Sequence, residues 1–394
     1  MSNAEYLNIG QKTVMKNVGR LPVVFVRGEG SRLWDADDKE YIDFLSGISV
    51  NNFGHCHPEI VAALSAQAGK ILHVSNYFYL EEQIKLAQEL IKLTNYHSVF
   101  FANSGAEANE AAIKLARKYG KTKLGGRYQI ITAKGSFHGR TMGALSATGK
   151  PQYQESFQPI VPGFVYAEYN SLKSWLGAMT DQTCAVMLEL VQGEGGVYPA
   201  NPEFVEGLAR LCYKYKLLLI VDEVQTGLGR TGKLFAYEHY NMKPNIVTIA
   251  KSIGGGVPCG ALLVDEEADI FTPGDHSTTI GGGGMAFAAG LVTLRLLQEP
   301  GFLDEVVRKG NYIKDTWELW RREMPVINGC RGLGLMLALD LKVPSKQVML
   351  ACLEEGLVVN AVSENAIRIL PALNISQDDL DAGLAILKRV LQQL

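Results

Sequence analysis

Short apolar runs alternate with polar turns and helical segments between about residues 97 and 265. A strand that is buried on both faces of a sheet reads as a continuous apolar run, and strands that alternate with helices indicate a mostly parallel sheet with right-handed crossovers. We therefore expect an α/β fold whose polar turns lie along one edge of the sheet. The predicted strands are 97–102, 128–133, 184–190, 217–221 and 246–250.

The turns that follow these runs carry chemically capable side chains. In open α/β sheets ligands bind in the crevice at the carboxyl ends of the strands, so groups in these turns are expected to face one site. The turns supply a small-residue segment at 103–106, Phe137, Arg140, Glu194, Asp222 and Lys251.

Lys251 and Asp222 form the most informative pair, because each directly follows a buried strand. A lysine amine forms a Schiff base with an aldehyde, and a carboxylate pairs with a pyridinium nitrogen. The pair therefore suits an enzyme that uses pyridoxal phosphate. A surface lysine after a strand is the commoner case for an arbitrary lysine, and the other turns favour the cofactor interpretation.

Three further features fit such a cofactor and its substrate. Segment 103–106 opens a predicted helix, and free N–H groups at a helix start attract an anion such as phosphate, although an ordinary N-cap is the commoner use. Phe137 could stack on a flat ring or simply pack in the core. Arg140 could clamp a carboxylate or form a structural ion pair. The apolar face of the predicted helix holds Ala108, Ala111, Ala112, Leu115 and Ala116.

Composition narrows the class of protein. The chain has 394 residues, 47% hydrophobic and 20% charged, which fits a globular enzyme with two domains or one large domain and an appendage. A net charge of −3 gives no basic footprint for nucleic acid or an anionic membrane. No apolar run approaches the roughly 18 residues of a membrane span. Residues 1–11 show no secretory signal, and the six cysteines are scattered, so we expect a cytoplasmic protein.

Two motifs suggest other chemistries, but the residues around each motif do not support them. Segment 227–233 matches both G-x-G-x-x-G and G-x-x-x-x-G-K, but Leu234 stands where a magnesium-binding hydroxyl is needed, and no strand feeds the glycines directly. The triplet 55–57, His-Cys-His, lacks further ligands at recognisable spacing, so a structured turn is expected and no metal site.

An ordered set of motifs resembles the class III (subgroup III, fold-type I) pyridoxal-phosphate aminotransferases, most closely the acetylornithine aminotransferases. The resemblance covers nearly the whole chain and implies a homodimer. It also implies a large cofactor-binding domain at 46–284 and a smaller α+β domain built from 1–45 and 285–394. The motifs are Ser104–Glu110, Phe137–Arg140, Asp222–Gln225 and Ala250–Lys251, flanked by 21–30, 54–58, 331–334 and 367–368.

The resemblance assigns a role to each site residue. For the cofactor, it implies Lys251 as the Schiff-base lysine, Asp222 at the pyridine nitrogen, Gly105 and Ala106 at the phosphate, Phe137 and Val224 on the two ring faces, and Gln225 near the ring hydroxyl. For the substrate, it implies Arg140 and Arg368 as carboxylate ligands, with Glu194 pairing with Arg368 when glutamate is absent. Thr278 and Thr279 would reach across the dimer interface, Thr279 to the partner's phosphate and Thr278 to its substrate.

The implied reaction is transamination of N-acetylornithine with 2-oxoglutarate in arginine biosynthesis, giving the semialdehyde and glutamate. Other ω-amino donors (ornithine, succinylornithine, 4-aminobutyrate), amino-acid epimerisation and a non-catalytic cofactor-binding protein remain as alternatives. Three departures from the family pattern bear on the donor and the loops: Val18 for a tyrosine, Gly283-Gly284 for Asn-Pro, and Leu190 for a proline.

Overall fold

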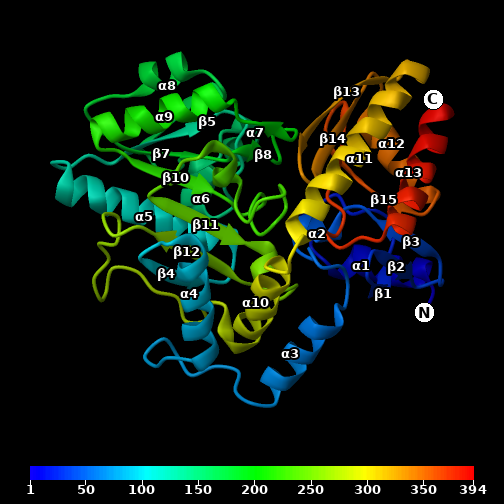
Figure 1. Ribbon diagram of the computed structural model, residues 1–394, viewed down its shortest axis with the longest axis horizontal. Coiled ribbons are helices and arrows are strands. Elements are labelled where there is room, and N and C mark those ends of the chain that lie inside the picture. The colour runs from blue at the N-terminus through cyan, green and yellow to red at the C-terminus, as the bar shows by residue number, and fades with distance from the viewer.

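A seven-stranded sheet forms the centre of the larger part of the molecule (Figure 1). The computed structural model describes all residues, 1–394. The strand order is β4-β12-β11-β10-β7-β5-β6, and every neighbouring pair is parallel except those that involve β12. The strands are β4 (Ser98–Ala102), β5 (Gln129–Ala133), β6 (Phe164–Ala167), β7 (Thr183–Leu188), β10 (Leu218–Asp222), β11 (Ile246–Ala250) and β12 (Gly260–Val264).

The predicted mostly parallel sheet is confirmed, and its apolar runs explain where the core lies. All residues of β10 are buried, and they alternate between two hydrophobic clusters. Leu218 and Ile220 pack with the alanine-rich face of α5 (Gly105–Lys123), whereas Leu219 and Val221 belong to the larger cluster. Burial on both faces is the reason that these strands read as uninterrupted apolar runs.

Helices surround this sheet. The glycine run 281–284 includes the first residues of α10 (Gly283–Leu297), which packs against α3 and α4. The helices of this part are α2 (Ser46–Ser49), α3 (Pro58–Ala68), α4 (Glu81–Thr94), α5, α6 (Met142–Ala147), α7 (Pro151–Gln154), α8 (Leu172–Ala178), α9 (Pro202–Tyr215) and α10, with short 3-10 turns η1 (Glu155–Phe157), η2 (Ala236–Tyr240) and η3 (Lys251–Gly254) and a hairpin of β8 (Val191–Gln192) and β9 (Tyr198–Pro199).

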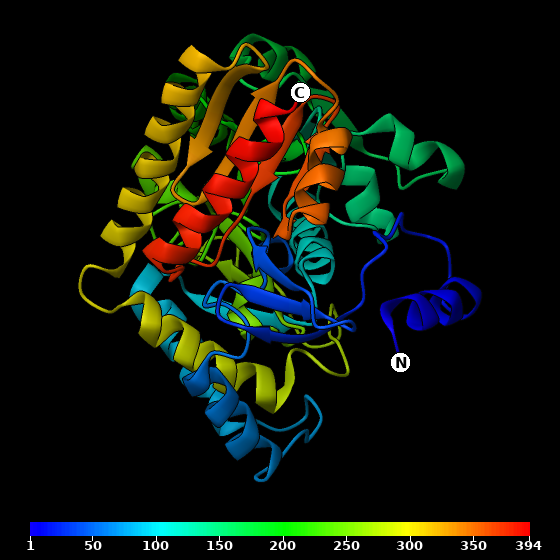
Figure 2. The same cartoon turned by 90° about the vertical axis from the view of Figure 1, so that its right-hand side faces the viewer.

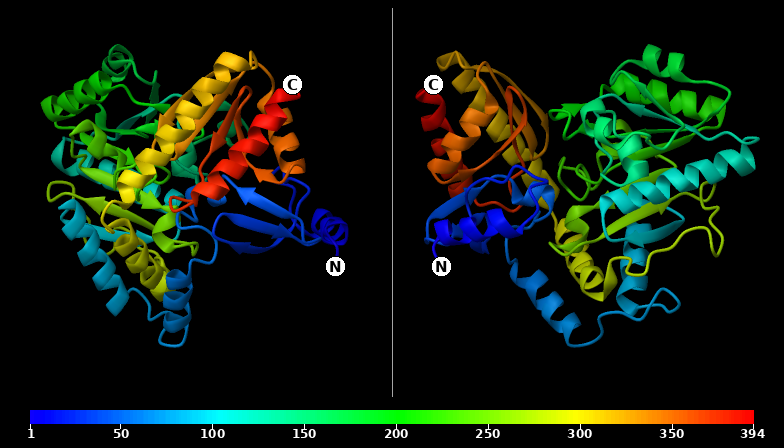
Figure 3. Two further views of the ribbon diagram at one scale, coloured as in Figure 1. Left: turned by 45° about the vertical axis from the view of Figure 1, so that its right-hand side comes forward. Right: turned by 180° about the vertical axis from the view of Figure 1, so that it is seen from behind.

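The two ends of the chain meet in the smaller part (Figures 2 and 3). Strand β3 (Glu40–Asp43) pairs in parallel with β15 (Leu357–Val358), which joins the N-terminal strands to the C-terminal segment. The domain boundaries near residues 45 and 284 stay predictions. The other elements here are α1 (Asn3–Thr13), β1 (Phe25–Glu29), β2 (Arg32–Asp35), α11 (Phe302–Glu323), β13 (Ile327–Leu333), β14 (Met336–Leu341), α12 (Ser345–Glu354), β16 (Asn360–Ser363), β17 (Ala366–Ile369) and α13 (Gln377–Gln392).

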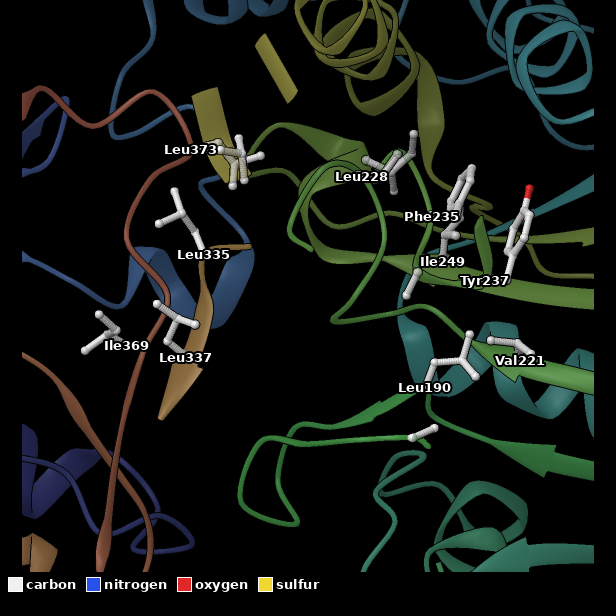
Figure 4. Close-up of a cluster of buried hydrophobic side chains, with 14 of the residues drawn as sticks. Leu190, Val221, Leu228, Phe235, Tyr237, Ile249, Leu335, Leu337, Ile369 and Leu373 are labelled. Carbon is white, nitrogen blue, oxygen red and sulfur yellow. The ribbon is translucent and has the colours of Figure 1, made fainter. Parts of the chain in front are cut away.

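A buried arginine ties the chain ends to the glycine-rich loop that resembles a nucleotide-binding motif. The Arg230 guanidinium donates to Ser49 Oγ (2.8 Å), Asn52 Oδ1 (2.6 Å), Leu335 O (3.0 Å) and Pro371 O (2.6 Å). Burial lowers the pKa of this side chain to about 9. Beside it, an apolar cluster draws on both parts of the molecule (Figure 4), and its labelled members are Leu190, Val221, Leu228, Phe235, Tyr237, Ile249, Leu335, Leu337, Ile369 and Leu373.

The predicted turn at 55–57 precedes α3 and is held by a contact between two side chains. His55 Nε2 lies 2.8 Å from Asp43 Oδ2. No group of three or more His, Cys, Asp or Glu side chains is arranged to hold a metal ion. None of the helices combines the length and the apolar character that a membrane span requires.

Candidate active site

A cavity of about 480 Å³ opens where the turns after β4, β5, β7, β10 and β11 meet. This volume lies within the range of roughly 300–1,000 Å³ that is typical of small-molecule sites. The predicted convergence of these turns on one edge is therefore observed. The predicted site residues that line the cavity are Gly105, Ala106, Phe137, Arg140, Glu194, Asp222, Val224, Gln225 and Lys251.

The Asp222 carboxylate is held rigidly at the floor of the cavity. Its Oδ2 accepts a hydrogen bond from Asn109 Nδ2 at 2.8 Å and lies 2.7 Å from His138 Nδ1, and its Oδ1 accepts from the Val224 N–H at 2.9 Å. Asn109 is fixed in turn by Thr248, whose hydroxyl donates to it at 2.7 Å. This network fixes the orientation of the Asp222 carboxylate in the cavity.

Lys251 enters the cavity from the first residue after β11. Its φ of +56° places it in the left-handed region, which a residue with a side chain adopts only when its surroundings impose it. Burial, reinforced by the nearby positive charge of Arg368, lowers the pKa of the Lys251 amine to about 8, against the opposing pull of Glu194 and Asp222. About a tenth of the amine is therefore uncharged, and nucleophilic, at pH 7, far more than for an ordinary lysine.

Helix α5 points its start at the cavity, and its local sequence shapes a cradle. Ser104 caps the helix by accepting the Glu107 N–H, and the first N–H groups of any helix have no partner within it. A side chain at Gly105 would collide with Val224, because an added Cβ would lie 2.7 Å from Val224 Cγ1. The cradle therefore offers free donors and a positive dipole end to an anion.

Glu189, which the sequence analysis missed, joins two loops of the site. Its Oε1 accepts from the Phe137 N–H at 2.9 Å and its Oε2 from the Gly193 N–H at 3.1 Å. Burial raises the pKa of this carboxyl to about 7, with the nearby Asp222 acting in the same direction. The predicted strand was extended to Leu190 and so enclosed Glu189, whereas β7 ends at Leu188.

His138 and Asn109 were also missed, because neither carries a distinctive signal of its own. His138 lies between two residues that were predicted for the site, and it is fully buried against Asp222. Asn109 lies one turn into α5 and lines the cavity. Only the position of each beside a recognised motif residue could have identified it.

Arg368, on β17 in the smaller part of the molecule, does not line the cavity itself but contacts two residues that do, Glu194 and Gln225. Its guanidinium donates to Glu194 Oε1 at 2.7 Å, Gln225 Oε1 at 3.2 Å and Asn360 Oδ1 at 2.8 Å. Arg368 is only 1% exposed, and its Nε has no hydrogen-bond partner. The site is thus completed by a buried arginine from the other part of the chain, paired with a cavity carboxylate.

Arg140 differs from Arg368 in being exposed at the cavity rim. Its guanidinium carbon lies 3.8 Å from the centre of the Tyr153 ring and 5.4 Å from that of Phe137. No acidic side chain pairs with it. This cation is therefore available to an anionic ligand.

Thr278 and Thr279 do not line the cavity. The Thr278 hydroxyl accepts from Asn103 Nδ2 at 3.3 Å, at the edge of the cavity, and Thr279 is exposed. Their predicted contacts with a partner chain stay predictions.

The residues of the cavity fit pyridoxal phosphate by their chemistry. A helix start with a small-residue cradle suits the phosphate, Phe137 offers an aromatic wall, Asp222 a fixed carboxylate and Lys251 a desolvated amine. All four groups line one cavity of suitable size.

Comparison with known proteins gives one consistent family. Residues 13–391 match the model of "Aminotransferase class-III". The acetylornithine aminotransferase of Caldanaerobacter subterraneus subsp. tengcongensis is 46% identical, over 98% of both chains. The crystal structure of the acetylornithine aminotransferase from Elizabethkingia anophelis superposes with a TM-score of 0.89 at 34% identity and covers all of both chains.

A structure of the ornithine aminotransferase from Toxoplasma gondii superposes with a TM-score of 0.95 at 30% identity, covering 100% of this chain and 94% of that one. That structure is described as showing partial occupancy of pyridoxal phosphate at the active site. The expected fold class, enzyme class and cofactor are confirmed. The chain belongs to the class III aminotransferases, fold-type I enzymes that depend on pyridoxal phosphate.

Proposed function

We propose that this enzyme transfers the ω-amino group of N-acetylornithine to 2-oxoglutarate, giving the semialdehyde and glutamate, as a step of arginine biosynthesis. Relatives named acetylornithine aminotransferase, at 46% and 43% identity over nearly the full length, support this donor. The observation that carries the proposal is the buried pair of Arg368 and Glu194, because it addresses the specific difficulty of this reaction.

That difficulty is that one site must accept two differently charged molecules in turn. A dicarboxylate such as 2-oxoglutarate needs a second cation, whereas an ω-amino donor places no carboxylate at that position. Leaving Arg368 buried and unpaired during the donor half-reaction would cost about 3–5 kcal/mol. Glu194 supplies the missing anion, and its side chain, 28% exposed, has room to leave when 2-oxoglutarate arrives.

The remaining side chains divide the chemistry. Bound pyridoxal phosphate supplies an electron sink that stabilises negative charge on the substrate carbon. Asp222 would hold a proton at the pyridine nitrogen, the start of α5 would hold the phosphate, and Lys251 would hold the cofactor and then move a proton at the substrate carbon. Val224, Gln225 and Phe137 would orient the ring, and Arg140 would bind a substrate carboxylate.

Substitution of the two switch residues tests the proposed function. Arg368→Ala should slow the 2-oxoglutarate half-reaction by about 100-fold and the donor half-reaction far less, because only the dicarboxylate needs this cation. Glu194→Ala should shift preference toward glutamate, because Arg368 then stands permanently free. Stopped-flow cofactor absorbance separates the half-reactions, and the exposed Arg295→Ala is the control. Equal losses in both half-reactions for Arg368→Ala, with donor preference unchanged in Glu194→Ala, would refute the switch.

The low pKa of Lys251 predicts how the apo-enzyme takes up its cofactor. Only the uncharged amine attacks the aldehyde, so the rate of covalent uptake should rise about tenfold per pH unit below pH 8 and level off above it. An ordinary lysine would keep gaining rate up to about pH 10.4. Reconstitution of apo-enzyme with pyridoxal phosphate from pH 6 to 10 measures this midpoint, and a midpoint near 10 would contradict the assignment.

The homodimer with a shared site is also part of the proposal. Tyr77, Phe78 and Tyr79 are 93%, 68% and 85% exposed. Three consecutive aromatic side chains rarely expose so much apolar surface to water in a monomer. Next to them, the Asn76 side chain donates to the carbonyl of Thr278, so the aromatic segment and the threonine loop lie on the same face. A second copy that covers this face would bring Thr278 and Thr279 to the neighbouring site.

All six cysteines are free, which favours a cytoplasmic location.

Ornithine is the second candidate donor, because the T. gondii structure with a TM-score of 0.95 is an ornithine aminotransferase. Val18 stands where the family pattern has a tyrosine, and because valine has no hydroxyl it cannot hold the α-carboxylate of either donor.

A further inference from the structure

Lys150 does not line the cavity, but it contacts the loop that carries Glu194. It precedes α7, and its Nζ donates to the main-chain carbonyl of Glu194 at 2.5 Å, across 44 residues of sequence. The side chain is partly buried, and its Nζ lies 5.4 Å from the centre of the Tyr153 ring, on which Arg140 also stacks. A second cation is therefore anchored on the same residue whose carboxylate pairs with Arg368.

Lys150 interacts electrostatically with both members of the Arg368–Glu194 pair. Burial lowers the pKa of its ammonium, while Glu194 and then Glu189 pull that pKa upward and Arg368 pushes it down. Burial opposes the charged form of Glu194, yet Arg368, followed by Lys150 and Lys251, holds the pKa of that carboxyl below its ordinary value. Glu194 thus contacts two cations, Arg368 at its carboxylate and Lys150 at its main-chain carbonyl.

The backbone of the loop is fixed, so that movement of Glu194 is confined to its side chain. The Gly193 N–H donates to Glu189 Oε2 at 3.1 Å, and the Gly196 carbonyl accepts from Arg331 Nε at 2.7 Å. With Lys150 holding the carbonyl of Glu194 itself, anchors lie before, at and after this residue. Because Lys150 Nζ lies 2.5 Å from the carbonyl oxygen of the same residue, a carboxylate that leaves Arg368 by rotation about its own side-chain bonds has this ammonium as a nearby cation.

We propose that Lys150 is a positioning residue that receives the Glu194 carboxylate when a dicarboxylate substrate takes its place on Arg368. Without this cation, the displaced carboxylate would remain partly buried without a partner, and that penalty would fall on binding of 2-oxoglutarate and glutamate only. The donor half-reaction, in which Glu194 stays on Arg368, does not draw on Lys150. The inference rests on the proposed function and adds a residue that sets substrate selectivity.

Lys150→Met tests this by removing the charge and keeping much of the side-chain length. The holoenzyme should bind 2-oxoglutarate about tenfold or more weakly, which corresponds to the loss of one charge-assisted hydrogen bond, while the N-acetylornithine half-reaction changes less than about twofold. Lys150→Arg should restore most of the affinity. The matched control is Lys134→Met, because Lys134 forms an isolated β-bridge with Gly149, the residue before Lys150, but its ammonium pairs with the exposed Glu168.

A double-mutant cycle with Glu194→Ala separates positioning from direct substrate binding. Once Glu194 is absent, Lys150→Met should have no further effect on 2-oxoglutarate affinity. An undiminished effect in that background, equal losses in both half-reactions, or unchanged 2-oxoglutarate affinity in Lys150→Met would overturn the inference. If wild-type enzyme itself fails to react with 2-oxoglutarate, the proposed function fails instead, so the two failures are distinguishable.

Discussion

Lys251→Ala is expected to lower turnover by about 10⁴-fold or more, with the fold intact. The amine of Lys251 is the only one that lines the cavity, and no other lysine replaces it there. Its loss removes both the covalent attachment of the cofactor and the proton transfer at the substrate carbon. Steady-state glutamate formation measures the effect.

The matched control is again a lysine at the end of a strand. Lys134 directly follows β5, but its ammonium is exposed, and Lys134→Ala should retain wild-type turnover. Borohydride treatment of the wild-type enzyme followed by peptide mapping should place the cofactor label on Lys251. Retained turnover in Lys251→Ala, or a label on another lysine, would remove Lys251 from the mechanism.

Arg230→Met is expected to destabilise the protein by about 3–5 kcal/mol, the largest stability effect in this account. The methionine fills a similar volume but leaves buried acceptors without a donor, on Ser49, Asn52, Leu335 and Pro371. Because these acceptors come from both ends of the chain, the loss should loosen the smaller part from the sheet.

Urea unfolding of the apo-enzyme at pH 7 measures this effect, since Arg230 is still charged there. The control is Arg295→Met, which removes an arginine that is 51% exposed and pairs with Glu59 and Glu299 on the surface. Such surface pairs contribute about 0–1 kcal/mol. If Arg230→Met costs no more than Arg295→Met, Arg230 does not hold the two parts together.

The sheet was predictable because its strands are buried on both faces. Leu218–Asp222 and Ile246–Ala250 are apolar throughout, so periodicity marks them clearly, and chain order then places their carboxyl ends together. The prediction of five turns at one edge required only this burial and the right-handed crossover rule. For the same reason Lys251 and Asp222 could be placed in one crevice without a structure.

The direction of a strand, by contrast, leaves no mark in its own sequence. Strand β12 (Gly260–Val264) is as apolar as its neighbours but runs antiparallel to both. The apolar pattern records burial and says nothing of polarity, so this reversal could not be predicted.

Residues that act through another side chain were the hardest to predict. Arg230 looked like part of a phosphate-binding loop, yet it serves as a link between chain segments more than 100 residues apart. Glu189 lies at the end of an apolar run, and Lys150 in an unremarkable turn. Their roles depend on distances across the fold, which one-dimensional spacing does not contain.

The proposed reaction is tested most directly by the two half-reactions of wild-type holoenzyme with a panel of amino donors. Stopped-flow absorbance should show N-acetylornithine converting the cofactor faster than ornithine, succinylornithine or 4-aminobutyrate, and 2-oxoglutarate returning it to its starting spectrum with formation of glutamate. Conversion with another donor while N-acetylornithine is inert would contradict the proposed substrate. Exchange of the substrate α-proton without any transfer of nitrogen to 2-oxoglutarate would indicate epimerisation and contradict the proposed reaction.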